Sequence, residues 1–185
     1  MSGKRGAEYA LDRLSVLVVE DSQFMRNLIE SVLHSLGIRK VHLCGDAAEA
    51  FTILKHKGID IVLVDWSMEP LDGIDFVRLV RNAKDSPNPY LPMIMISGHS
   101  EAWRIEQARD VGVNEYLAKP FTAHALCQRI QACIESPRPF VRSKTFFGPD
   151  RRRKNNGPPE GVAERRASEI SGNEDDESIP EGLRW

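Results

Sequence analysis

The chain has 185 residues, which is enough for one domain of typical size with an appendage but too few for two large cores. With 41% hydrophobic residues, 28% charged residues and a net charge of -2, it has the composition of a globular protein, and its overall charge favours neither a nucleic-acid binder nor a membrane-surface protein. No apolar segment is long enough for membrane insertion, and three cysteines without metal-ligand spacing fit a reducing compartment, so we expect a cytoplasmic location.

Five short apolar runs, rich in β-branched residues, alternate with segments of helical length. Such uninterrupted runs are typical of strands buried on both faces, as in a parallel sheet covered by helices. The predicted strands cover residues 16–19, 41–44, 59–64, 93–96 and 113–117. The βα pattern therefore predicts an α/β fold with a doubly wound five-stranded parallel sheet and helices on both faces.

The helical segments carry apolar residues at helical spacing. The first shows this best, because an apolar stripe runs from Phe24 to Leu36, Ser22 can cap its start and Gly37 can end it. Further helices are predicted near 46–57, 73–84, 100–111 and 121–135. In such folds ligands bind outside the carboxyl ends of the strands, so we expect the chemistry there.

The periodicity stops at Pro137, and we expect residues 137–185 to be a disordered tail. Residues 138–154 hold seven basic residues and one acid, whereas residues 169–181 hold six acids and no base. The segment 146–150, FFGPD, is a candidate docking motif. The basic run 151–154 could contact nucleic-acid phosphates, an acidic groove of a partner protein or the acids of the tail itself. A solvated charged tail is the favoured interpretation, and nucleic-acid binding is not expected.

Polar residues follow the predicted strands at the points where those strands end. They are Glu20, Asp21, Asp65, Ser97 and Lys119. Three converging carboxylates repel one another unless a cation compensates them, and oxygen ligands of this kind suit Mg²⁺. Beside such an ion Asp65 can act as a nucleophile toward phosphorus, with Lys119 neutralising the phosphoryl charge and Ser97 donating a hydrogen bond.

Four motifs resemble the receiver domains of two-component response regulators. They are VVEDS at 18–22, VDWSM at 64–68, ISG at 96–98 and YLAKPF at 116–121. Their order and their placement on the predicted elements make the resemblance specific, and it covers residues 13–136, after an N-terminal extension of residues 1–12. It implies the strand order 2-1-3-4-5.

The resemblance also implies roles for individual residues. Asp65 is expected to be the phosphoacceptor, and Lys119 is expected to pair with the phosphoryl group. The peptide bond between Lys119 and Pro120 is expected to be cis. Ser97 and Tyr116 are expected to form the switch. Mg²⁺ is expected to be surrounded by Glu20, Asp21, Asp65 and the backbone carbonyl of Ser67. The implied partners are a histidine kinase or phosphotransfer protein and a downstream protein target, which contacts the face made by the fourth helix, fifth strand and fifth helix.

The sequence departs from the usual receiver pattern in the loop after Asp65. It reads Met68-Glu69-Pro70, which shifts the usual proline by one residue. Ser67 and His99 stand at positions that tune water access to the acyl phosphate in this family, so the lifetime of the phosphorylated state is left open.

Three function classes follow from these observations. The first is a stand-alone response regulator that is phosphorylated on Asp65 and is not an enzyme beyond its own phosphorylation and slow dephosphorylation. The second is an adaptor that acts through its tail independently of phosphorylation. The third is a phosphohydrolase with an Asp nucleophile, which needs a second Asp two residues later, where this chain has Ser67.

Overall fold

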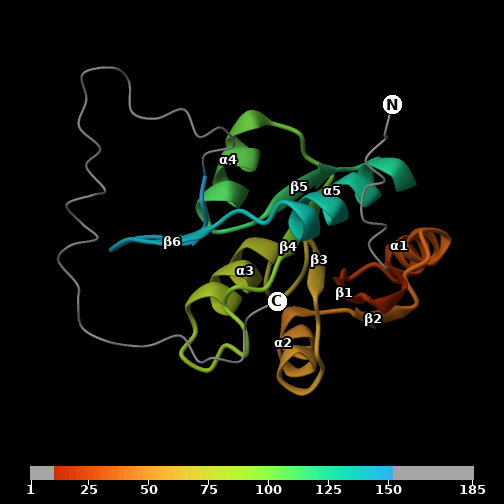
Figure 1. The fold of residues 1–185 in the computed structure, drawn as a ribbon, viewed down its shortest axis with the longest axis horizontal. Coiled ribbons are helices and arrows are strands. Elements are labelled where there is room, and N and C mark those ends of the chain that lie inside the picture. The colour runs from red at the N-terminus through yellow and green to blue at the C-terminus, as the bar shows by residue number, and fades with distance from the viewer. Residues whose placement is uncertain (1–10, 152–185) are drawn as a thin grey trace, which may run out of the picture. The chain divides into compact units, whose positions relative to one another are not determined.

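The computed structural model describes residues 11–151, and its core is a five-stranded parallel sheet with helices on both faces (Figure 1). The strand order is β2-β1-β3-β4-β5, which confirms the expected fold class. The strands are β1 (Ser15–Val19), β2 (Lys40–Cys44), β3 (Ile61–Asp65), β4 (Met93–Ser97) and β5 (Glu115–Ala118). Strands β3 and β5 begin two residues later than predicted, because the residues before them belong to the preceding loops.

Five helices connect the strands, and a short 3-10 turn (Leu11–Arg13) precedes β1. The helices are α1 (Gln23–Ser35), α2 (Ala47–His56), α3 (Gly73–Asn82), α4 (Ala102–Asp110) and α5 (Ala123–Glu135). Helices α1 and α5 pack on one face of the sheet, and α2, α3 and α4 pack on the other. No helix within residues 11–151 combines the length and the apolar character that crossing a lipid bilayer requires.

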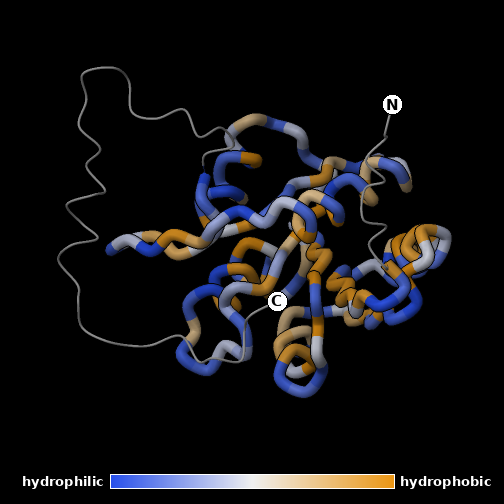
Figure 2. Tube along the Cα trace, viewed as in Figure 1, coloured by the Kyte–Doolittle hydropathy of each residue, from blue (hydrophilic) through white to orange (hydrophobic). Residues whose placement is uncertain are grey.

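Strand β1 shows how the sequence generates two cores. All five of its residues are buried, and alternate side chains point to opposite faces of the sheet. Leu17 and Val19 belong to the core beneath α2, α3 and α4, whereas Val16 and Val18 belong to the core beneath α1 and α5. The central strands therefore carry hydrophobic residues on both faces (Figure 2).

Side-chain caps fix the start of most helices at the carboxyl edge of the sheet. Ser22, as predicted, accepts a hydrogen bond from the backbone N–H of Met25 at the start of α1. Asp72 caps α3 and Thr122 caps α5 in the same way. Helix α4 differs, because Glu101 makes no side-chain capping bond and Ala108 is the helix's single buried residue. Helix α4 therefore has the weakest local anchoring of the five.

The prediction of disorder from Pro137 is wrong for residues 137–151. They form an antiparallel hairpin of β6 (Phe140–Arg142) and β7 (Phe147–Pro149), and the compact unit extends to Arg151. The physical reason is an aromatic cluster, in which the rings of Tyr90, Phe140 and Phe147 lie with centroids 5.1 to 5.5 Å apart. The motif 146–150 thus docks on its own domain, while the prediction for residues 152–185 lies outside the described residues.

Candidate functional site

Three of the predicted site residues are in direct contact at the carboxyl edge of the sheet. Glu20 follows β1, Asp65 is the last residue of β3, and Lys119 follows β5. The Lys119 ammonium lies 2.7 Å from Oδ1 of Asp65 and 2.8 Å from Oε2 of Glu20. One lysine therefore bridges two carboxylates that are 45 residues apart in the chain.

The bridge leaves the site with a surplus of negative charge. The side chains of Glu20 and Asp65 are only 3% and 6% exposed, so water screens their charges poorly. Burial raises the pKa of Glu20 above its usual value, the hydrogen bond from Lys119 acts against this, and the charge of Asp65 adds to it. For Lys119, burial lowers the pKa, but hydrogen bonds to Asp65 and Glu20 outweigh burial, so that the net shift is upward and the ammonium stays charged.

This charge balance bears on the expected Mg²⁺. No three His, Cys, Asp or Glu side chains within residues 11–151 already form a ligand cluster. Two buried carboxylates against one ammonium nevertheless leave an uncompensated negative charge, and carboxylate oxygen is the ligand type that Mg²⁺ prefers. The residues present therefore fit this cation.

Asp21 lies at the exposed rim of the site, next to the buried Glu20. The turn that carries both acids is held by Arg26, whose Nη1 donates to the backbone carbonyls of Glu20 at 2.5 Å and Asp21 at 3.0 Å. Arg26 was not among the site residues predicted from the sequence. Its spacing of five and six residues from the acid pair places it in the first turn of α1, but an arginine there is ordinarily a solvated surface residue.

The loop after Asp65 closes tightly back on this residue. The backbone N–H of Ser67 donates to Oδ2 of Asp65 at 2.8 Å, which orients the carboxylate. Gly73 opens α3, and its N–H donates to the carbonyl of Trp66 at 2.9 Å. A Cβ atom on Gly73 would collide with the backbone carbonyl of Asp65, so glycine is required at this close approach. The role of the Ser67 carbonyl stays a prediction.

Two X-Pro bonds at this edge are cis. The bond between Lys119 and Pro120 is cis as expected, and the bond between Glu69 and Pro70, in the loop that departs from the usual receiver pattern, is cis as well.

The predicted switch residues lie on neighbouring strands beside the acids. Ser97 ends β4, is buried, and accepts a hydrogen bond from the backbone N–H of His99 at 3.1 Å. The Tyr116 ring points inward, with 9% of the residue exposed, and its hydroxyl donates to the carbonyl of His99 at 2.6 Å. Burial raises the pKa of the Tyr116 hydroxyl, which remains a neutral donor. The His99 ring lies 3.7 Å from the carboxylate of Glu101, at the start of α4.

Comparison with known proteins identifies the family to which this parallel sheet with an acidic carboxyl edge belongs. The family model described as the response regulator receiver domain matches residues 16–131. The chain therefore belongs to the response-regulator receiver family, as the sequence motifs indicated.

The chain is similar to chemotaxis proteins. It is 32% identical to CheY-3 of Vibrio cholerae over 122 residues, which cover 66% of this chain and 92% of that protein. It is 33% identical to CheY of Pseudomonas aeruginosa over 122 residues, which cover 66% of this chain and 97% of that protein.

Solved structures give the same result. The receiver domain of a sensor histidine kinase from Pseudomonas aeruginosa, determined with a magnesium ion in its active site cleft, matches with a TM-score of 0.59 and 32% identity. That match covers 66% of this chain and 98% of the other. The CheY4 protein of Vibrio cholerae matches with a TM-score of 0.58 and 26% identity, covering 64% of this chain and 96% of the other.

Proposed function

We propose that this protein is a response regulator that takes a phosphoryl group onto Asp65 from a phosphohistidine of a kinase or phosphotransfer protein. The observation that carries the proposal is the Lys119 bridge, with its ammonium 2.7 Å from Asp65 and 2.8 Å from Glu20. A carboxylate that can act as a nucleophile, a cation and a second buried acid lie within hydrogen-bond distance of one another there, which supports the proposal. Glu20, Asp21, Asp65 and the Ser67 carbonyl are the proposed surroundings of Mg²⁺.

The phosphoryl transfer proceeds with a simple exchange of bonds. A carboxylate oxygen of Asp65 forms a bond to phosphorus, the bond from phosphorus to the donor's imidazole nitrogen breaks, and its electron pair stays on that nitrogen. Lys119 stays protonated and neutralises charge on the phosphoryl oxygens, and the Ser97 hydroxyl donates to one of them. Mg²⁺ supplies further neutralisation of these oxygens when bound. The Ser67 N–H, at 2.8 Å from Asp65, keeps the carboxylate in place for attack.

The surface of α1 suits docking of the phosphodonor. Phe24 and Leu28 are 75% and 45% exposed, and their spacing of four residues puts them on one face of α1 beside the acid turn. Exposed apolar residues that are contiguous mark interaction sites. The downstream target is proposed to contact the face of α4, β5 and α5, in a cytoplasmic setting that the free cysteines of the described chain fit.

A phosphorylation assay with a small donor tests the proposal. Wild type and Asp65→Asn are incubated with Mg²⁺ and acetyl phosphate, and intact mass is recorded under conditions that preserve acyl phosphates. Wild type should gain one phosphoryl group, whereas Asp65→Asn and EDTA-treated wild type should gain none. An unmodified wild type would refute the proposal and leave the phosphorylation-independent adaptor as the better hypothesis. Turnover of many equivalents of an organic phosphate would instead favour the phosphohydrolase.

A further inference from the structure

The C-terminal hairpin, defined as residues 138–151, is attached to the end of α4 that lies away from Asp65. The guanidinium of Arg138 donates to the backbone carbonyls of Val113 and Asn114, in the turn between α4 and β5. Nη1 of Arg151 lies 3.1 Å from Oδ1 of Asp110, the last residue of α4. The hairpin therefore holds both the helix end and the turn that follows it.

A direct backbone contact also fixes the C-terminal hairpin in place. Gly112 has a φ of +100°, a conformation that glycine adopts readily. A Cβ atom on Gly148 would lie 2.7 Å from the Cα of Gly112 and 2.9 Å from the ring of Phe146. The hairpin and the turn at Gly112 approach this closely because both positions are glycine.

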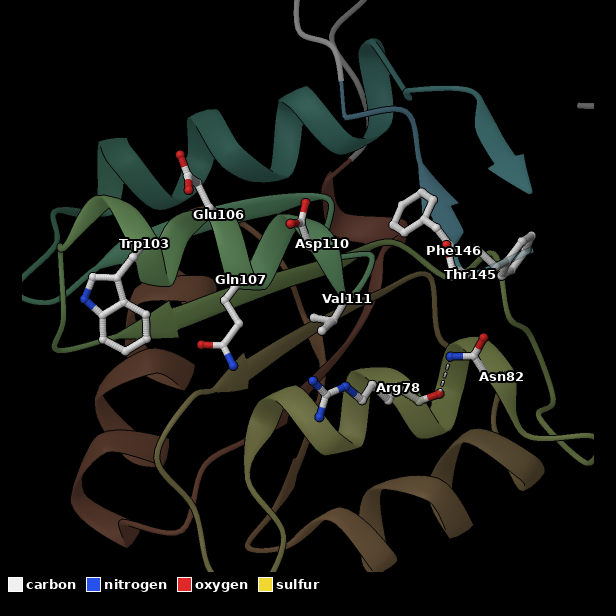
Figure 3. Close-up of a pocket in the computed structure, with 10 residues that line it drawn as sticks. Arg78, Asn82, Trp103, Glu106, Gln107, Asp110, Val111, Thr145 and Phe146 are labelled. Atoms are coloured by element: carbon white, nitrogen blue, oxygen red, sulfur yellow. Dashed lines mark hydrogen bonds between the residues drawn. The ribbon is translucent and has the colours of Figure 1, made fainter. Parts of the chain in front are cut away.

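Beyond this attachment, the C-terminal hairpin and α4 diverge. Figure 3 shows Trp103 and Gln107 of α4, Arg78 of α3 and Phe146 of the hairpin around a groove of about 580 Å³. The ion pair that joins the hairpin to α4 lies at the end of the helix, at Asp110. The hairpin can therefore set the position of this helix end without covering the rest of α4.

Aromatic contacts connect the other end of α4 to the phosphoacceptor. The Arg104 guanidinium lies 5.2 Å from the ring of Trp66, which follows Asp65, and 4.6 Å from the ring of Trp103. Trp66 in turn contacts the Tyr116 ring edge to face, with centroids 6.4 Å apart. The inward position of Tyr116 and the seating of α4 are thus parts of one packing arrangement.

We infer that the C-terminal hairpin is a positioning element that holds α4 in the arrangement with Tyr116 turned inward and thereby favours the phosphorylated form. The inference rests on the proposed function and on the switch role expected for Tyr116, and it adds that the inward position of the Tyr116 ring belongs to the phosphorylated form. Because coupling between two sites is reciprocal, a hairpin that favours the phosphorylated form must itself be stabilised by it. A hairpin that served only the stability of the domain would show neither effect.

The test uses the full chain and beryllium trifluoride with Mg²⁺ as a phosphoryl mimic, with binding followed by tryptophan fluorescence. Gly148→Ala should undock the hairpin through the clash with Gly112. We expect it to weaken binding of the mimic about fivefold, the low end of coupling between sites. Ser143→Ala, at an exposed position of the same hairpin, is the matched control and should bind like wild type.

Hydrogen exchange of the wild-type chain gives the reciprocal measurement, which holds even if Gly148→Ala does not fold. Amides of the hairpin strands should exchange more slowly in the presence of the mimic and Mg²⁺. Equal exchange with and without the mimic, or equal binding by wild type and an undocked Gly148→Ala, would overturn the inference. If wild type does not bind the mimic at all, the proposed function itself fails.

Discussion

Replacing Lys119 with methionine removes the cation between two buried carboxylates and leaves the site with two negative charges. Removing one partner of a buried ion pair costs about 3 to 5 kcal/mol, and because 22% of the Lys119 side chain is exposed we expect a loss of about 3 kcal/mol. For a domain of this size that loss lowers the melting temperature by about 6 to 12 °C. Urea unfolding at neutral pH without Mg²⁺ measures it, and Lys144→Met, at an exposed lysine on the C-terminal hairpin, is the matched control.

The loss should depend on pH and Mg²⁺ with a definite sign. Burial and the charge of Asp65 already raise the pKa of Glu20, so the folded state holds this proton more tightly than the unfolded state. Such a group stabilises the folded state below its unfolded pKa, and this contribution is lost as pH rises through its folded pKa. Removing Lys119 raises the pKa of Glu20 further, so the deficit of Lys119→Met should shrink as pH falls toward that range.

Millimolar Mg²⁺ should reduce the same deficit, because the ion replaces the lost positive charge. A deficit that is the same at every pH and at every Mg²⁺ concentration would refute the electrostatic argument, since lost packing alone would then explain it.

Two further substitutions test the site and its surroundings. Gly73→Ala should destabilise the protein by about 2 kcal/mol or more and slow phosphorylation by acetyl phosphate, because the new Cβ collides with the carbonyl of Asp65. The control is Gly58→Ala, where a Cβ meets nothing within 4 Å and neither effect is expected. Equal behaviour of the two variants in urea unfolding and in the phosphorylation assay would contradict this prediction. Phe24→Ala should slow phosphoryl transfer from a cognate phosphohistidine donor about tenfold, as expected for an interface anchor, but leave the rate of phosphorylation by acetyl phosphate unchanged. The control is Leu79→Ala, which removes an exposed apolar side chain on α3. An equal loss of rate with both donors would argue against docking on α1.

The clustering of the site residues at the carboxyl edge of the sheet could be predicted, because it depends on the strand topology and not on the positions of individual atoms. Parallel strands end at the same edge, so Glu20, Asp65 and Lys119 had to lie near one another once the five runs were recognised as strands. The sequence could not show that Lys119 would contact both acids at hydrogen-bond distance. The sequence also could not identify Arg26, because this residue acts by donating to the backbone carbonyls of Glu20 and Asp21. The orientation of those carbonyls depends on the turn and is not visible in the sequence.

The C-terminal hairpin was missed for a different physical reason. Its strands have three residues each, too few for alternation to show a period, and its composition is that of a tail. Its stability comes from Tyr90 and from the close approach of Gly148 to Gly112, partners that are distant in sequence. The local sequence pattern carries no information about contacts between distant residues. Hydrophobic periodicity therefore does not predict segments that fold by packing against the rest of the domain.

The C-terminal hairpin bears on the proposed switch through its contact with α4. Helix α4 has one buried residue and no side-chain cap, so its position depends on contacts at its two ends. One end is packed through Arg104 against Trp66, which follows Asp65, and the other is bound by a segment that lies beyond the family match, which ends at residue 131. A helix held in this way responds to changes at either end. We therefore expect the response of α4 in this protein to depend on both Asp65 and the hairpin.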